Sequence, residues 1–287
     1  MSYPSPGNVA ISLAEFTEPD LELSLEEVVR LGVNHVELWI PRHATVHTAR
    51  AVGNLLERRG LRTACVSSPS YLHGDESGQG ARLIGESIEI AQVLGAPFVN
   101  TYFGHGGDGD DTEAAHHYAR CLSGLLWRAE LVNVTIVLEN EFDAFGHDPD
   151  HVDISRRPEA LKQLVDIVGS PNFKLNFDAA NFRCVGEDAA AAACALAPDV
   201  AYVHVKDVVE LRKGRNPDPG WKRYSDGDRV YQSVQLGQGE VPWARILKTF
   251  NSVGFHGFFT LEPHCEADNL VAELQASLSY LLNGFGR

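Results

Sequence analysis

The chain has 287 residues, of which 44% are hydrophobic, and its formal net charge is -15. This length is enough for one large core, and α/β barrels of about 250 residues form single domains. Nucleic acids and anionic membranes bind clustered lysine and arginine, and this acidic chain has no long basic run. The composition therefore predicts a folded protein without a nucleic-acid or membrane partner.

The cysteines are odd in number and form no C-x-x-C pair; they are Cys65, Cys121, Cys184, Cys194 and Cys265. This pattern predicts free thiols in a reducing compartment. The N-terminus has no basic segment followed by an apolar stretch, and no run reaches the roughly 18 apolar residues of a membrane helix. We therefore expect a soluble, cytoplasmic protein.

Short β-rich segments alternate with helical patterns along the chain. The expected strands cover residues 8–16, 35–40, 63–68, 98–104, 135–141, 174–181, 201–207 and 257–264. Such alternation is typical of parallel strands joined by helices, and the repeats predict a single-domain (β/α)₈ TIM barrel over residues 1–287. A doubly wound open sheet is the alternative, but residues 14–20 are not the glycine-rich phosphate turn that would follow its first strand.

Helix start and stop signals support this alternation. Ser24 is an expected N-cap for a helix that ends at Gly32, and Pro158 suits the first turn of a helix over 156–169. Further helical patterns cover residues 81–95, 186–198, 241–254 and 269–286.

Two connections are too long to be simple turns, at about residues 142–156 and 208–239. Both follow the C-terminal ends of strands, where barrel enzymes build their active sites. Long loops in a compact domain are usually functional or disordered. Their aromatic residues, which are Phe142, Phe145, Trp221, Tyr224 and Tyr231, favour ordered walls or contact surfaces.

The last four expected strands each end in a residue that can ligate a metal: Glu139, Asp178, His204 and Glu262. Adjacent strands lie about 4.8 Å apart, so the ends of barrel strands can converge. Three carboxylates and an imidazole suit one divalent cation, with Mn²⁺ first and Mg²⁺, Co²⁺ or Zn²⁺ as alternatives. The sequence therefore predicts a metal site at this end of the barrel.

The stretches "VLENE", "NFDAANF", "YVHVKD", "LGQGEVPW" and "FFTLEPH" resemble the sugar phosphate isomerase/epimerase family of xylose-isomerase-like barrels. The resemblance implies the metal ligands Glu139, Asp178, His204 and Glu262. It also implies that Glu139 and Glu262 are catalytic. One removes the proton α to a metal-bound carbonyl of a keto sugar or oxidised glycoside, and the other returns it. The enediolate so formed gives epimerisation or isomerisation.

Two branches of this family differ in what they imply. In the AP endonuclease branch, which needs three zinc ions, a histidine stands where this chain has Asn181, and we reject that branch. The catalytic subunit of C-glycoside deglycosidases is the alternative that we keep. It implies a lyase that cleaves a 3-oxo-glycoside by β-elimination, with His147 as acid/base and a small second subunit. We expect a homo-oligomer, to which such a small second subunit could be added. A remote alternative, an inactive barrel used as a binding subunit, conflicts with the intact ligand set.

Six further residues are candidates for substrate binding: Trp39, Phe103, His105, Asn181, Lys206 and Arg229. Each has an ordinary structural explanation as well. Trp39 and Phe103 could be packing aromatics at strand ends, and His105 could cap a glycine-rich turn. Lys206 could orient the ligand His204 or form an ion pair, and Arg229 suits a surface position.

Overall fold

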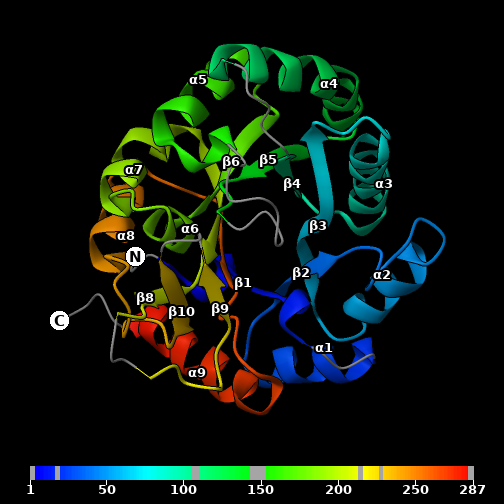
Figure 1. Cartoon of the computed structure of the whole chain (residues 1–287). Helices are drawn as coiled ribbons and strands as arrows, with labels where there is room; N and C mark the ends of the chain where they lie inside the picture. The colour runs from blue at the N-terminus through cyan, green and yellow to red at the C-terminus, as the bar shows by residue number, and fades with distance from the viewer. Residues whose placement is uncertain are drawn as a thin grey trace.

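The structure is a computed structural model that describes residues 4–16, 20–104, 110–142, 153–212, 216–225 and 229–283. Its barrel strands are β1 (Val9–Ser12), β2 (His35–Trp39), β3 (Arg62–His73), β4 (Phe98–Gly104), β5 (Thr135–Glu139), β6 (Phe173–Asp178), β7 (Val200–Val205) and β11 (Phe258–Leu261). They are parallel and close in the order β1-β11-β7-β6-β5-β4-β3-β2. Figure 1 views the barrel from one end. The predicted (β/α)₈ barrel is confirmed, and the open sheet is wrong.

Helices surround the barrel on the outside (Figure 1). They are α1 (Leu21–Arg30), α2 (Ala49–Glu57), α3 (Gln79–Leu94), α4 (Asp111–Leu131), α5 (Pro158–Val168), α6 (Ala179–Cys184), α7 (Ala189–Leu196), α8 (Trp243–Ser252) and α9 (Ala267–Asn283). Within the described residues, none of the helices has the length and apolar character needed to cross a membrane.

The expected helix signals are confirmed in part. Pro158 begins α5, and Gly95 ends α3 in the left-handed conformation, with φ 66. The predicted N-cap at Ser24 is wrong, because α1 begins one turn earlier. There Asp20 accepts the Glu22 backbone N–H at 2.8 Å, and Ser24 is buried inside the helix. Asp is as good an N-cap as Ser, and Asp20 comes first in the chain.

Alternation along the strands decides which side chains reach the barrel interior. The large hydrophobic core between the barrel and the helices, called the outer core below, contains Ile136 and Leu138 of β5. Val137 belongs instead to a separate small cluster with Tyr202 of β7. Successive residues of a strand point to opposite faces. Glu139 and His204, two residues beyond Val137 and Tyr202, therefore also point into the barrel.

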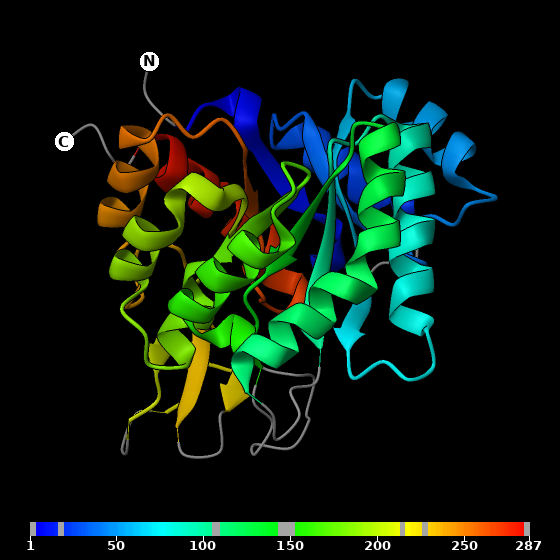
Figure 2. The same ribbon diagram turned by 90° about the horizontal axis from the view of Figure 1, so that it is seen from above.

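The long connection after β7 contains an unexpected antiparallel sheet of β8 (Asp207–Glu210), β10 (Val230–Val234) and β9 (Arg223–Ser225), in that order. Figure 2 shows it extending from one end of the barrel. Tyr224 and Tyr231 are buried in it. The described residues of this connection thus form a regular sheet, and its role as the wall of a functional site stays a prediction.

Asp207 ties the end of this connection to the barrel. Its carboxylate accepts the backbone N–H groups of Val208, Gly237, Gly239 and Val241 at 2.9 to 3.1 Å. A Cβ added to Gly239 would lie 1.9 Å from Asp207 Oδ1, so no other residue fits there without displacing the carboxylate. The stretch "LGQG" thus fixes the small sheet next to the end of β7.

We predict that Gly239→Ala lowers the free energy of unfolding by about 3 kcal/mol, because its methyl group collides with Asp207. The matched control is Gly124→Ala on the exposed face of α4, where nothing lies within 4 Å of an added Cβ. That variant should be up to about 1 kcal/mol more stable than the wild type, because Ala favours helix over Gly. Urea unfolding of both variants checks this, and equal stabilities would contradict it.

Candidate metal centre

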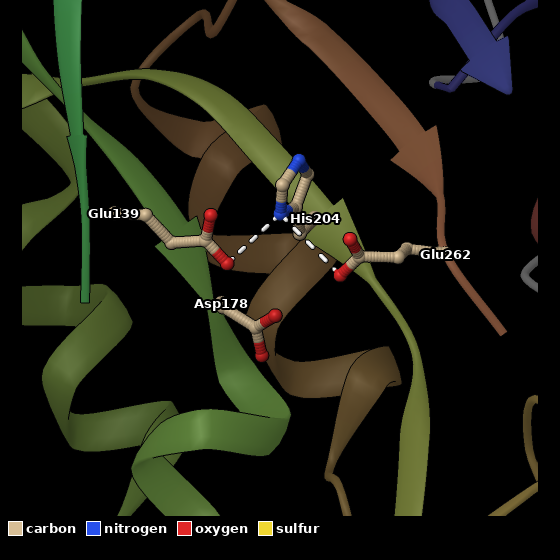
Figure 3. A group of neighbouring side chains, drawn as sticks. All are labelled: Glu139, Asp178, His204 and Glu262. Atoms are coloured by element: carbon tan, nitrogen blue, oxygen red, sulfur yellow. Dashed lines mark hydrogen bonds and ion pairs between the residues drawn. The ribbon is translucent and has the colours of Figure 1, made fainter. Parts of the chain in front are cut away.

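Four side chains meet at the C-terminal end of the barrel. Glu139 and Asp178 are the last residues of β5 and β6, His204 lies in β7, and Glu262 follows β11. One ligand atom of each lies within 4.8 Å of the others. Figure 3 shows the four side chains pointing toward one another. The structure therefore brings together all four residues predicted to bind a metal.

Hydrogen bonds orient each side chain of this cluster. His204 Nδ1 lies 2.9 Å from Glu139 Oε1 and 3.5 Å from Glu262 Oε2. The other oxygen of Glu139, Oε2, accepts the side-chain amides of Asn100 at 2.9 Å and Asn176 at 3.4 Å. These amides leave Oε1 directed at the centre of the cluster.

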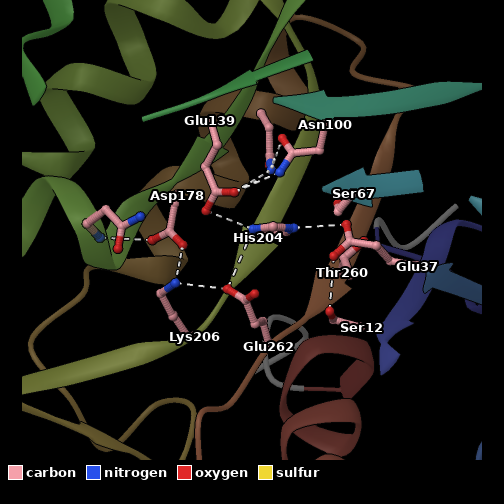
Figure 4. A network of polar contacts seen from close by, with 12 residues as sticks. Ser12, Glu37, Ser67, Asn100, Glu139, Asp178, His204, Lys206, Thr260 and Glu262 are labelled. Carbon is pink, nitrogen blue, oxygen red and sulfur yellow. Dashed lines mark hydrogen bonds and ion pairs between the residues drawn. The ribbon is translucent and has the colours of Figure 1, made fainter. Parts of the chain in front are cut away.

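Lys206 is the cation of the cluster. Its ammonium lies 2.7 Å from Asp178 Oδ2 and 2.9 Å from Glu262 Oε2 (Figure 4). Burial alone would lower the pKa of Lys206, but Asp178 and Glu262 raise it well above its usual value. The lysine is therefore a permanent positive charge at physiological pH.

The carboxylates respond to this environment in opposite ways. Burial raises the pKa of Asp178, and Lys206 only partly offsets this. Burial would also raise the pKa of Glu262, but Lys206 and His204 hold it well below its usual value.

Burial would lower the pKa of His204, but Glu139, Glu262 and the neighbouring Glu37 raise it well above its usual range.

The charge balance of the cluster fits a divalent cation. Among the described residues, Glu37, Glu139, Asp178 and Glu262 form ion pairs with His204 or with the ammonium of Lys206. This leaves an excess of three negative charges when His204 is neutral and of two when it is protonated. Uncompensated buried charge is costly. Three carboxylates and one imidazole nitrogen are a donor set that suits Mn²⁺, Mg²⁺, Co²⁺ or Zn²⁺.

A second group of side chains, which the sequence does not predict, contacts Glu262 from the side of the pocket. Glu15, Glu262 and His264 each offer a ligand atom within 4.8 Å of the others. Glu15 accepts the His264 backbone N–H at 2.6 Å, and the Tyr224 hydroxyl is hydrogen-bonded to His264 Nδ1. His264 adopts φ 52, which is uncommon for a residue other than glycine. Contacts far apart in sequence thus hold the loop that carries Glu262.

Glu139 and Glu262 of this cluster, together with Lys206, line a pocket of about 690 Å³. Trp39 and Tyr102 form one aromatic pair in its lining, with ring centroids 6.4 Å apart, and Phe142 and Tyr224 form another at 5.3 Å. Pockets with mostly apolar walls and a few convergent polar groups are typical of small-molecule sites.

The predicted substrate-binding residues divide into three groups. Trp39, Asn181 and Lys206 line the pocket. Phe103 does not, since it is stacked between His73 and Tyr118 in the outer core; the inward position belongs to its neighbour Tyr102.

Arg229 also lies away from the described lining of the pocket. Its guanidinium is 5.8 Å from the centroid of the Tyr231 ring and lies beside Gly186. The predicted acid/base His147 and the candidate His105 fall in residues 143–152 and 105–109, which lie outside the described residues.

We predict that the chelator-treated protein binds one Mn²⁺ or Zn²⁺ per chain at this cluster and that Asp178→Ala binds at least about 100-fold more weakly, because a ligand is lost. Bound metal should raise the melting temperature of the wild type. Glu240→Gln is the control, because it removes a carboxylate that pairs with Arg183 outside the cluster. Calorimetric titration measures both variants, and equal affinities would contradict the assignment.

Comparisons with known proteins agree with this fold. Residues 25–283 match the family described as Xylose isomerase-like TIM barrel. No match was found among curated proteins. Similar solved structures include a xylose isomerase domain protein from Planctomyces limnophilus, with 20% identity, 98% of this chain and 96% of that chain covered, and a TM-score of 0.74.

Two more similar structures carry informative names. The IolI protein, solved with a binding zinc atom, has 16% identity, 97% and 99% coverage of this chain and its own, and a TM-score of 0.74. The 3-keto-D-glucoside 4-epimerase YcjR from E. coli has 12% identity, 96% and 98% coverage, and a TM-score of 0.73. Since the family match spans most of the sequence, this chain belongs to the xylose isomerase-like TIM barrel family.

Proposed function

We propose that this protein is a divalent-metal-dependent enzyme that epimerises or isomerises a keto sugar or an oxidised glycoside. In this reaction a carboxylate removes the proton on the carbon next to the substrate carbonyl. The observation that carries the proposal is the convergence of Glu139, Asp178, His204 and Glu262, of which Glu139 and Glu262 line a pocket.

Two of these carboxylates, Glu139 and Glu262, are the proposed proton-exchanging groups. Glu139 and Glu262 approach His204 from β5 and from the residue after β11, on different sides of the cluster (Figure 3). Both line the pocket. One carboxylate removes the proton, and the other delivers a proton to the opposite face, which inverts the carbon. A bound divalent ion would supply Lewis-acid polarisation of the carbonyl.

Other residues complete this chemistry. The ammonium of Lys206 lies in the pocket wall beside Glu262 and stabilises negative charge that develops on the substrate oxygen. The rings of Trp39 and Tyr102 offer apolar faces that exclude water from the reacting carbon. The zinc-containing and epimerase neighbours support metal-assisted sugar chemistry, although their sequence identity to this chain is low.

The aromatic pocket walls favour a second candidate, a lyase. Two ring pairs, Trp39–Tyr102 and Phe142–Tyr224, suit a substrate with a flat group attached to the sugar. In such a 3-oxo-C- or O-glycoside, the same proton removal leads to β-elimination, in which the bond to the aglycone breaks. His147 would protonate the aglycone, and this protein would be a catalytic subunit with a small second subunit.

We predict that the manganese-loaded protein turns over one of two substrate panels in deuterated water, because both reactions begin with removal of a carbon-bound proton. One panel contains free ketoses and the other 3-oxo-glycosides with aromatic aglycones. Mass spectrometry that finds deuterium in a sugar of otherwise unchanged composition indicates an epimerase or isomerase, and a released aglycone indicates the lyase. Absence of turnover on both panels, with or without a candidate second subunit, would falsify the proposal.

Glu139→Gln and Glu262→Gln should each lower kcat by about 10²–10⁴-fold, because an amide cannot accept the proton. The matched control Glu266→Gln removes a carboxylate at the pocket rim and should keep kcat within about threefold. Circular dichroism checks that all three variants are folded. Full activity in both of the first two variants would exclude the proton exchange proposed above.

A further inference from the structure

His204 is held between carboxylates on both of its ring nitrogens (Figure 4). Nδ1 faces Glu139 at 2.9 Å and Glu262 at 3.5 Å, both of which are candidate metal ligands. Nε2 lies 3.0 Å from Oε2 of Glu37, which comes from β2. The two nitrogens therefore face different parts of the barrel interior, and only Nδ1 faces the cluster.

Glu37 is deeply buried and has few partners. Its side chain is 2% exposed. The Ser12 hydroxyl donates to its Oε1 at 3.0 Å, and the Tyr202 hydroxyl is also hydrogen-bonded to it. Within the described part of the chain, His204 is the only basic group that forms an ion pair with Glu37. A buried carboxylate needs such a donor, so the N–H on Nε2 is strongly favoured.

A neutral imidazole carries one N–H and one lone pair. Where an acceptor holds the proton on one nitrogen, the lone pair lies on the other. Metal-binding histidines are oriented in this way by carboxylates that are not themselves ligands. At His204, carboxylates face both nitrogens, but only the one at Nε2, Glu37, is not a candidate metal ligand. With the proton on Nε2, the lone pair of Nδ1 points toward Glu139 and Glu262.

We propose that Glu37 is a positioning residue that keeps the proton of His204 on Nε2 and thereby presents Nδ1 to a divalent cation. This inference rests on the metal centre of the proposed function. It assigns a role to a strand residue that does not line the pocket or contact substrate.

The surroundings hold both partners in place. Ser12 fixes the Glu37 carboxylate from β1. The Tyr202 ring meets the His204 ring edge-on, with centroids 5.7 Å apart and an angle of 71° between the planes. Val36 and Leu38, on either side of Glu37, belong to the outer core, so Glu37 points into the barrel. A flip of the imidazole would replace the Nε2 donor at Glu37 with a carbon atom.

The experiment measures metal affinity and the position of the proton. Glu37→Gln retains the size of the side chain but removes its charge, and we expect its Zn²⁺ and Mn²⁺ affinities to be about 10–100-fold weaker than those of the wild type. Ser12→Ala should lower affinity by a smaller factor. Glu240→Gln, the matched control outside the cluster, should bind as the wild type does. Two-dimensional ¹H–¹⁵N spectra of the zinc-loaded wild type should show the His204 proton on Nε2.

Separate outcomes distinguish this inference from the proposed function. Zinc binding by the wild type together with an unchanged affinity of Glu37→Gln, within about threefold, overturns the role of Glu37 alone. A zinc-loaded spectrum with the proton on Nδ1 overturns it as well, and this result does not require any variant to fold. A wild type that binds no divalent ion overturns the metal centre and this inference together.

Discussion

The arrangement of the site depends on the compensation of several buried carboxylates at the C-terminal end of the barrel. Glu37, Glu139, Asp178 and Glu262 are gathered around His204, with Lys206 as their ammonium partner. Each carboxylate also needs neutral donors or a cation, because the interior cannot solvate it. Asn100 and Ser12 supply such donors from β4 and β1. Most of the barrel strands thus contribute to one polar network.

The register between neighbouring strands brings the side chains of this network together. Asp178 and His204 are direct neighbours across β6 and β7, and Thr260 is the neighbour of His204 across β11. Because alternate residues point inward, a shift of one residue in any of these strands would exchange a ligand for a core residue such as Val205. The apolar outer core therefore also fixes the geometry of the polar centre.

The sequence predicts the four candidate metal ligands better than it predicts the residues around them. Glu139, Asp178, His204 and Glu262 are recognisable because each lies at or next to the end of an apolar strand. Glu37 is not, since it lies within a strand and its partner is His204, 167 residues along the chain. The alternation that places Tyr102 inward and Phe103 outward depends on the register of β4, which composition does not give.

The small sheet was missed for a different reason. Its strands have three to five residues, too few for a clear period, and they lie within a long polar connection. Yet Tyr224 from this sheet pairs with Phe142 in the pocket wall. In the proposed function, epimerisation and elimination begin with the same proton removal, so we expect the pocket walls to decide which substrate enters and which step follows. Barrel enzymes diversify in these loops while the floor is retained. On this proposal, the choice between the two reactions lies in the part of the chain whose structure is hardest to predict from sequence.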